Sequence, residues 1–395
     1  MSDTTTEAKP VRKPNTIENL FLGCSVRDVP KLIPGVLLLV ALVALIIWLT
    51  DLINSALGFK GLISYILMVI VFGIVLRNTL TIPQIFMPGI SFSIKKLMRL
   101  GIILMGIRLS IFDALKIGAW GIPIVVVCVL VGLTVTIYVG RWLKLPDRLT
   151  TLIAVGTGIC GASAIIATAP GIGAKDEEVT YAVANITVFG IIALVAYPFL
   201  AHWLFSADTT MIGLFLGTSI HETAQVAASG MVYDQTFGSG IPPTTLDVAT
   251  VIKLVRNVLM AAVIPGMTFF YARRTGIQQA RQETGLQKAL NLFPLFILGF
   301  LLMAMLRSIG DASIQGSGAA FGLWGNEDWT AIHRGIKEWS GYVLATAMAG
   351  VGLSTSFRVM KGLGIKPFYI GLFAATVVGA VSIIIVFALG GFVQV

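Results

Sequence analysis

The sequence predicts an all-α membrane protein with about 11 transmembrane helices, some of them interrupted inside the membrane. Of its 395 residues, 56% are hydrophobic and only 12% are charged, whereas a soluble domain averages about 25% charged. The mean hydropathy of +0.90 comes from apolar runs that recur along almost the whole chain. Gly and hydroxyl residues interrupt several runs, which a membrane helix tolerates only where its backbone faces protein or water.

The apolar runs predict a polar cytoplasmic tail, residues 1–30, followed by a transmembrane domain, residues 31–395. We expect no cleavable signal peptide, because the first run, Leu32–Leu49, is too long for the apolar core of one. Residues 308–339, which contain three Trp, are expected to form an outer loop with an interfacial helix. The predicted spans are residues 32–54, 61–76, 97–112, 118–140, 149–170, 179–205, 209–230, 244–271, 289–307, 340–356 and 367–391.

Basic residues indicate the orientation. When the segments between spans are assigned to alternate sides, most of the 28 Lys and Arg residues fall on the side of the N-terminus. The positive-inside bias then places the N-terminus in the cytoplasm and the C-terminus outside. This distribution also explains the net charge of +9 without a nucleic-acid partner. The three cysteines make no disulfide framework.

An internal repeat is predicted from two similar pentapeptides. Gly106–Ser110 reads Gly-Ile-Arg-Leu-Ser and is followed by Phe112 and Lys116. Gly350–Ser354 reads Gly-Val-Gly-Leu-Ser and is followed by Phe357 and Lys361. They fall on the third and tenth predicted spans, so the copies would run in opposite directions, as in inverted-repeat transporters. The alternative is that small residues recur because they allow helices to pack closely. Since Gly352 replaces Arg108 in the second copy, we expect Arg108 to snorkel to the membrane interface.

Two stretches inside apolar spans share the pattern Gly-Thr-x-Ile. Gly156–Ser163 reads Gly-Thr-Gly-Ile-Cys-Gly-Ala-Ser, and Gly217–Gln225 reads Gly-Thr-Ser-Ile-His-Glu-Thr-Ala-Gln. Secondary transporters use such interruptions to form a substrate site, because unwound backbone and half-helix ends supply fixed partial charges. Their separation on the fifth and seventh spans makes them parallel copies. Either one stretch enters and leaves on the same side, or the likeness reflects shared small residues.

The first stretch carries groups suited to an oxyanion. Gly156 and Gly161 would let backbone N–H groups approach a ligand, and a half-helix N-terminus after them would carry positive partial charge. Thr157 and Ser163 could donate hydrogen bonds, although hydroxyls in membrane helices often bond their own backbone. Cys160 could be a soft ligand or a nucleophile, or a small residue where helices pack closely.

The second stretch contains an adjacent ionisable pair, His221 and Glu222, in the middle of a predicted span. Ionisable groups at that depth are costly and usually line a pathway, and an imidazole beside a carboxylate could couple transport to protons. The alternative is a helix end at the membrane surface where both are solvated. His221 and Gln225 share a helical face. A metalloprotease motif would need a second His where Gln225 stands.

Lys253, Arg256 and Asn257 form a polar stripe on the eighth predicted span. Two cations there suggest an anion site or an ion pair with Glu222, and the two roles can coexist. We find no nucleotide, zinc or dinucleotide motif, and we expect neither a cofactor nor a metal. The predicted site comprises Gly156, Thr157, Cys160, Gly161, Ser163, His221, Gln225, Lys253 and Arg256 for substrate, with His221 and Glu222 for proton coupling.

Five motifs together resemble the sulfate exporter family of YeiH-type conserved bacterial membrane proteins, over residues 30–393. This resemblance implies an inner-membrane protein that exports a sulfur oxyanion, and a fold of crossed, interrupted helices like those of cation/proton antiporters and bile-acid symporters. Many relatives have Asp where this chain has Glu222, which keeps the carboxylate but lengthens its reach. The motifs are Leu100–Leu109, Gly156–Ala164, Ser219–Val226, Asp247–Arg256 and Ala347–Ser354.

We therefore expect a secondary transporter that exports sulfate, sulfite or a small organosulfonate, with or without proton coupling. The first alternative is a cation/proton exchanger in which Glu222 exchanges a proton for Na⁺ and Lys253 is its counter-ion. An enzyme using Cys160 and His221 lacks an evident third group, and we expect no enzymatic activity. The expected partners are a small anion and the lipid bilayer, and a homodimer is one option for the oligomeric state.

Overall fold

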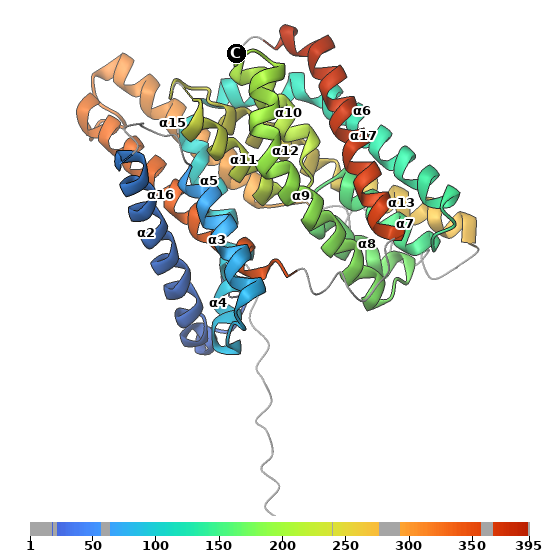
Figure 1. Ribbon diagram of the computed structural model, residues 1–395. Coiled ribbons are helices and arrows are strands. Elements are labelled where there is room, and N and C mark those ends of the chain that lie inside the picture. Colours follow the sequence, from blue (N-terminus) through green and yellow to red (C-terminus); the bar gives the residue numbers. More distant parts are fainter. Residues whose placement is uncertain are drawn as a thin grey trace, which may run out of the picture.

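In the computed structural model, the described residues form helices arranged in two groups (Figure 1). Described are residue 18 and residues 22–56, 64–238, 240–275, 293–356 and 366–393. Within these ranges the only extended pairing is an isolated bridge between Ala320 and Trp324. The expectation of an all-α chain is therefore confirmed for this part of the protein. Most of the predicted tail, residues 1–30, lies outside the described residues.

The first helix group contains the N-terminal helices and two helices that follow much later in the chain. Helix α16 packs along α2, α3 and α5. Close approach requires small residues: a Cβ on Gly73 of α3 would lie 3.0 Å from the Cα of Gly352 in α16. The members are α2 (Ile33–Ala56), α3 (Tyr65–Thr79), α4 (Met87–Phe92), η3 (Ser93–Leu97), α5 (Met98–Met105), η4 (Gly106–Arg108), α15 (Phe296–Ser317) and α16 (Asn326–Ser354).

The second helix group contains the remaining helices and both predicted interruptions. Helices α10, α11 and α6 pack around α12, which places α12 near the centre of the molecule (Figure 1). The members are α6 (Ile111–Trp142), α7 (Asp147–Gly158), α8 (Ala162–Ile172), α9 (Asp176–Leu204), α10 (Thr209–Ser219), α11 (Thr223–Thr236), α12 (Thr245–Val258), α13 (Met260–Thr275) and α17 (Lys366–Leu389).

Among the described helices, five are long and apolar enough to cross a membrane, and six are if α12 and α13, bent by 41°, count as one span. Every predicted interval overlaps one or more of these helices. Many are short because the chain is interrupted, so the number 11 and the orientation stay predictions. The expected outer loop 308–339 is largely helical, since α15 extends to Ser317 and α16 begins at Asn326.

The two copies of the predicted repeat both lie where a helix ends. The first follows α5 and stops at Leu109, which is extended (ψ 150°). The second closes α16 at Ser354, before the extended Thr355 (ψ 102°). The later part of the second copy, residues 357–361, lies outside the described residues. The inverted symmetry of the copies stays a prediction.

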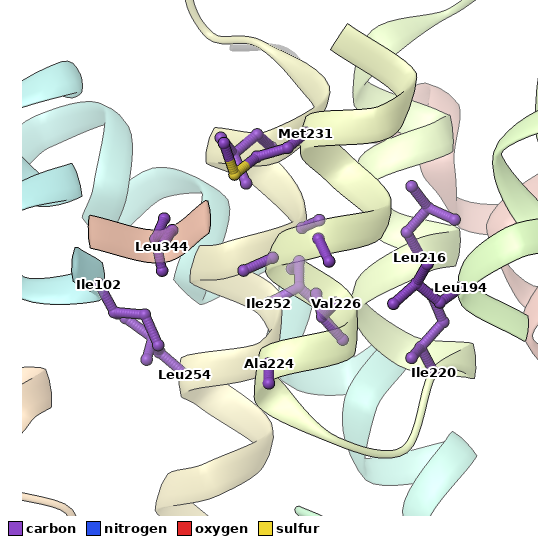
Figure 2. Close-up of a cluster of buried hydrophobic side chains, with 14 of the residues drawn as sticks. Ile102, Leu194, Leu216, Ile220, Ala224, Val226, Met231, Ile252, Leu254 and Leu344 are labelled. Atoms are coloured by element: carbon purple, nitrogen blue, oxygen red, sulfur yellow. The ribbon is translucent and has the colours of Figure 1, made fainter. Parts of the chain in front are cut away.

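One apolar core joins the two helix groups. Ile102 of α5 and Leu344 of α16 belong to the same buried cluster as Leu254 of α12 and Met231 of α11. Figure 2 shows Ile102 and Leu344 facing the α11 and α12 side chains. Inside a membrane, van der Waals packing of such side chains holds helices together, because lipid tails are as apolar as the side chains themselves. Helix α12 is therefore held by apolar contacts with both groups.

Candidate functional site

The first predicted interruption is present between α7 and α8. Helix α7 ends at Gly158 and α8 begins at Ala162, which leaves Ile159–Gly161, here called the first break, outside the helices. Gly161 has φ +73° and ψ −129°, a conformation that side chains other than hydrogen make costly. The chain therefore needs glycine at this position to turn from α7 into α8.

The second predicted interruption, Ile220–Glu222, lies between α10 and α11 and is called the second break. Ile220 and Glu222 are extended, with ψ of 138° and 139°. The two breaks touch although they are far apart in the sequence. A Cβ on Gly161 would lie 3.3 Å from the Cβ of Glu222, so we refer to them together as the paired breaks.

Lys253 of α12 reaches both breaks. Its Nζ donates to the carbonyl oxygens of Ile159 at 3.0 Å, Ile220 at 2.9 Å and His221 at 2.5 Å. The side chain is fully buried. An ammonium group has three N–H donors and a neutral amine has two. Three carbonyl acceptors around one nitrogen therefore indicate the charged form.

Arg256, one helical turn further along α12, binds the same two helix ends. Its Nε donates to the carbonyl of Gly158 at 2.9 Å, and its Nη1 donates to those of Thr218 at 2.9 Å and Ile220 at 3.0 Å. Its Nη2 donates to the carbonyl of Thr157. Arg256 is also fully buried. The planar guanidinium can serve several acceptors at once because its donors are fixed in a fork.

These contacts explain how two helices can end in the middle of the molecule. The last carbonyls of a helix have no intrahelical partner and carry negative partial charge, which a nearby cation stabilises. Lys253 and Arg256 supply that cation to α7 and α10 together. The sequence left open an ion pair between Glu222 and one of these cations. No such pair is formed between these residues, and main-chain carbonyls take the donors instead.

Several buried polar atoms near the paired breaks have no hydrogen-bond partner in the described part of the chain. Buried polar groups in native proteins are nearly always satisfied, so unpaired ones are candidates for contact with water or a ligand. His221 is 1% exposed, and its ring approaches the main chain of Thr157. The atoms without a partner are Thr157 Oγ1, at least one nitrogen of the His221 ring, Gln225 Oε1, Ser229 Oγ, Thr250 Oγ1 and Asn257 Oδ1.

The two half-helices that leave the breaks begin without side-chain caps. Gly161, before α8, has no side chain that could cap the helix, and the side chain of Glu222, before α11, accepts no hydrogen bond from the first turn. The free N–H groups and the positive dipole end favour an anion at such a position. Ser163 lies in the first turn of α8 and is exposed, and Glu222 is half-buried. These two residues mark the accessible side of the paired breaks.

The remaining predicted residues have packing contacts that the sequence did not reveal. The Sγ of Cys160 lies 3.4 Å from the Sδ of Met260. The Nε2 of Gln225 donates to the carbonyl of Thr187 in α9 at 3.2 Å. A Cβ on Gly156 would lie 2.7 Å from the Cδ1 of Ile165. Gly156 therefore allows α8 to pack closely against α7.

Comparison with known proteins identifies the family. The family model described as "Conserved hypothetical protein 698" matches residues 34–371. A UPF0324 membrane protein of Streptococcus agalactiae is 30% identical over 339 residues, 86% of this chain and 92% of the relative. Others from Bacillus anthracis and Corynebacterium glutamicum are 31% identical over 360 residues (90% and 94%) and 33% over 328 (82% and 85%). The chain belongs to the UPF0324 family of membrane proteins.

The family and the apolar helices together make this UPF0324 chain a multi-pass membrane protein. The names of the relatives specify no substrate. Export of a sulfur oxyanion is therefore a proposal for this chain. Within the described residues of the UPF0324 chain, no group of three or more His, Cys, Asp or Glu side chains is placed to hold a metal ion.

Arg108 does not snorkel as expected. Its Nε lies 2.5 Å from Asp247 Oδ1, and its Nη2 donates to Thr244 Oγ1 at 3.1 Å. The Arg108 and Asp247 side chains are only 11% and 1% exposed. The snorkelling prediction was wrong because it considered the repeat alone and not a partner on α12.

The same contacts fix the start of α12 in the UPF0324 fold. Thr244 and Asp247 form a capping box, and Asp234 accepts from the backbone N–H groups of Thr245 and Leu246 at 3.1 and 3.2 Å. The Thr-x-x-Asp spacing is a sequence signal for a helix start. It could have identified the start of α12, whose contacts through Arg108, Asp234, Thr244 and Asp247 are here called the anchor. By holding the start of α12, the anchor sets where Lys253 meets the breaks.

Proposed function

We propose that this UPF0324 protein is a secondary transporter that exports a sulfur oxyanion, namely sulfate, sulfite or a small organosulfonate, through the paired breaks. The observation that carries the proposal is the burial of two cationic side chains there. Lys253 and Arg256 are fully buried, and neither has an acid as an ion-pair partner among the described residues. Helix-end carbonyls offset this charge only in part, because each end carries about half an elementary charge.

The anion would be held mainly by main-chain N–H groups and neutral side chains. All three donors of Lys253 are already used, and Arg256 uses four of its five. These residues therefore act on the anion through their field. Direct contact falls to the starts of α8 and α11, to Ser163, and to the unpaired atoms of Thr157 and His221.

Export of such an anion is electrically favourable in a cell with a negative interior. Each charge gains about 2.3 kcal/mol per 100 mV, and a divalent anion gains about twice that. Proton coupling is therefore not required to drive export. His221, buried beside the Thr157 main chain, and Glu222, half-buried at the second break, are the groups through which a proton would couple. We propose no enzymatic role, because Cys160 contacts Met260 and not His221.

Flux measurements in liposomes test this proposal. Purified protein is reconstituted, and uptake of radiolabelled sulfite and sulfate is followed in choline medium, with and without a pH gradient. We expect saturable uptake above that of empty liposomes, and loss of uptake in Lys253→Ala. A response to the gradient that disappears in Glu222→Gln would identify proton coupling. Absence of flux for every one of these anions would contradict the proposal.

A cation/proton exchanger is the second candidate, because Glu222 is a half-buried carboxylate at a break that interacts electrostatically with Lys253 without forming an ion pair. The carbonyls argue against it. In transporters with broken helices these groups coordinate Na⁺, whereas here they accept hydrogen bonds from Lys253 and Arg256. Proton movement that depends on Na⁺ and on Glu222, without anion flux, would establish the exchanger.

A further inference from the structure

The carbonyl groups at the paired breaks form a cation-binding arrangement that the protein fills with its own side chains. Six carbonyl oxygens from the ends of α7 and α10 converge on α12. Unwound carbonyls and half-helix C-terminal ends are the groups that bind Na⁺ in many secondary transporters. Here each accepts a hydrogen bond from Lys253 or Arg256. The six belong to Thr157, Gly158, Ile159, Thr218, Ile220 and His221.

The ammonium of Lys253 has the surroundings of a bound monovalent ion. Its nitrogen is 2.5–3.0 Å from three oxygens contributed by both breaks, and the side chain has no exposed surface. No carboxylate pairs with it in the described part of the chain. An ammonium group and a small alkali cation both bind carbonyl oxygens as compact point charges.

We propose that Lys253 is a tethered cation that permanently occupies a monovalent-cation position between the two breaks. The wild-type protein then needs no bound Na⁺ or K⁺ to hold the breaks together. Shortening the side chain should open that position to a small cation from solution. That Lys253 replaces a bound cation between the breaks does not depend on the proposed function. Only the consequence for transport, namely anion movement that is independent of Na⁺, rests on it.

Removal of the ammonium should leave carbonyl oxygens that favour the binding of another cation. In Lys253→Ala, the carbonyls of Ile159 and His221 lose their only hydrogen-bond donor among the described residues, while Ile220 keeps Arg256. A buried acceptor without a partner is unfavourable because it has lost its water as well. The removed methylenes leave space in which ammonium, methylammonium or an alkali cation can reach the same oxygens.

Thermal unfolding of purified protein in matched salts tests this inference. Wild type and Lys253→Ala are heated in chloride salts of choline, Na⁺, K⁺, ammonium and methylammonium at one ionic strength. We expect the melting temperature of wild type to be the same in all of them. Lys253→Ala should melt lower in choline and recover by about 2–4 °C, in a saturable manner, with at least one small cation.

Two variants separate a refilled site from a general salt effect. In Lys253→Met the thioether occupies the volume of the lysine stem, so methylammonium should not stabilise it. Lys116→Ala removes an exposed lysine and should respond to all five salts as wild type does. If Lys253→Ala does not fold, Lys253→Ser, whose short side chain also leaves room for a cation, is tested in the same salts.

Equal melting temperatures of Lys253→Ala, or of Lys253→Ser where Lys253→Ala does not fold, in choline and in every small cation would overturn the inference. So would a wild-type protein whose stability requires Na⁺. Sulfite flux is measured in parallel: in Lys253→Ala it should be lost in choline and return with the stabilising cation. If wild type moves no anion, the proposed function fails, while the melting temperatures still decide whether Lys253 is a tethered cation.

Discussion

Lys253 and Arg256 together donate seven hydrogen bonds to main-chain carbonyls at the paired breaks. Each cation therefore has a structural duty, because it stabilises helix ends that would otherwise be buried without partners. The same charges create the positive field that favours an anion. At the scale of the residue, a substitution that removes the charge cannot distinguish the structural role from the proposed role in transport. A substitution that keeps the charge and changes the hydrogen-bond geometry can distinguish them.

Arg256→Lys keeps the charge and removes the fork of donors. One ammonium cannot reach all four carbonyls that Arg256 serves, and each buried carbonyl left unpaired costs about 1–3 kcal/mol. We therefore expect a clearly lower melting temperature in detergent, although the net charge is unchanged. Arg141→Lys, at an exposed arginine, is the control. A melting temperature equal to that of wild type would mean that the field of Arg256, and not its hydrogen bonds, maintains the breaks.

Gly161→Ala should destabilise the first break. The residue has φ +73°, which costs about 1–3 kcal/mol for other residues, and the new Cβ would lie 3.3 Å from Glu222. The control is Gly266→Ala in α13, where a Cβ meets nothing within 4 Å and where Ala favours helix by about 1 kcal/mol. Thermal unfolding compares the two. Equal effects would show that the break does not depend on glycine at position 161.

At the scale of the element, α12 is positioned at both ends by polar contacts. Its start is held by Arg108, Thr244, Asp247 and Asp234, and its later turns hold the breaks through Lys253. Because a helix is stiff, a shift at its start would move Lys253 relative to its three carbonyls. The anchor is therefore expected to influence the site from a distance.

A double-mutant cycle tests the anchor. Arg108→Met, Asp247→Asn and the double variant should give a coupling energy of about 0.5–3 kcal/mol, because contacting residues in one network are not additive. The exposed pair of Lys31 and Asp28 is the comparison, for which at most about 1 kcal/mol is expected. Stability is followed by thermal unfolding. Additive effects of Arg108→Met and Asp247→Asn would show that the two residues do not stabilise the start of α12 together.

At the scale of the whole molecule, the paired breaks lie in the second helix group, next to the first. The contacts between the groups include α11 against α3 and α16, the ion pair of Arg108 with Asp247, and a hydrogen bond from Ser64 Oγ to Gln235 Oε1 at 2.7 Å. A transporter must expose its site to each side of the membrane in turn. The two groups (Figure 1) are the natural units for that movement.

Cross-linking tests whether the groups move. Ser64→Cys with Gln235→Cys, joined by a short bifunctional thiol reagent, should abolish sulfite flux, and cleavage of the linker should restore it. Asn78→Cys with Thr355→Cys lies within the first group, where Asn78 Nδ2 donates to the Thr355 carbonyl at 3.0 Å, and its linker should leave flux intact. Full flux through the linked Ser64–Gln235 pair would exclude relative movement at this contact.

The sequence by itself determined the class, the helical content and the places where helices stop. Composition and apolar runs are properties of many residues, so the predicted class of protein does not depend on any single position. The breaks were visible because glycine and polar residues interrupt apolar spans, and Gly161 has a conformation that the sequence signals directly. The polar stripe of Lys253 and Arg256 was visible for the same reason.

Only the tertiary structure decided what those polar groups bind. A hydrogen bond needs donor and acceptor within about 3 Å, and the acceptors of Lys253 come from two helix ends that are distant in sequence. Main-chain carbonyls occur at every position and so leave no signal in the residue pattern. The partner of Arg108 on α12 was hidden in the same way. The sequence shows which charged side chains lie in apolar spans, and the packing of distant helices decides which groups surround them.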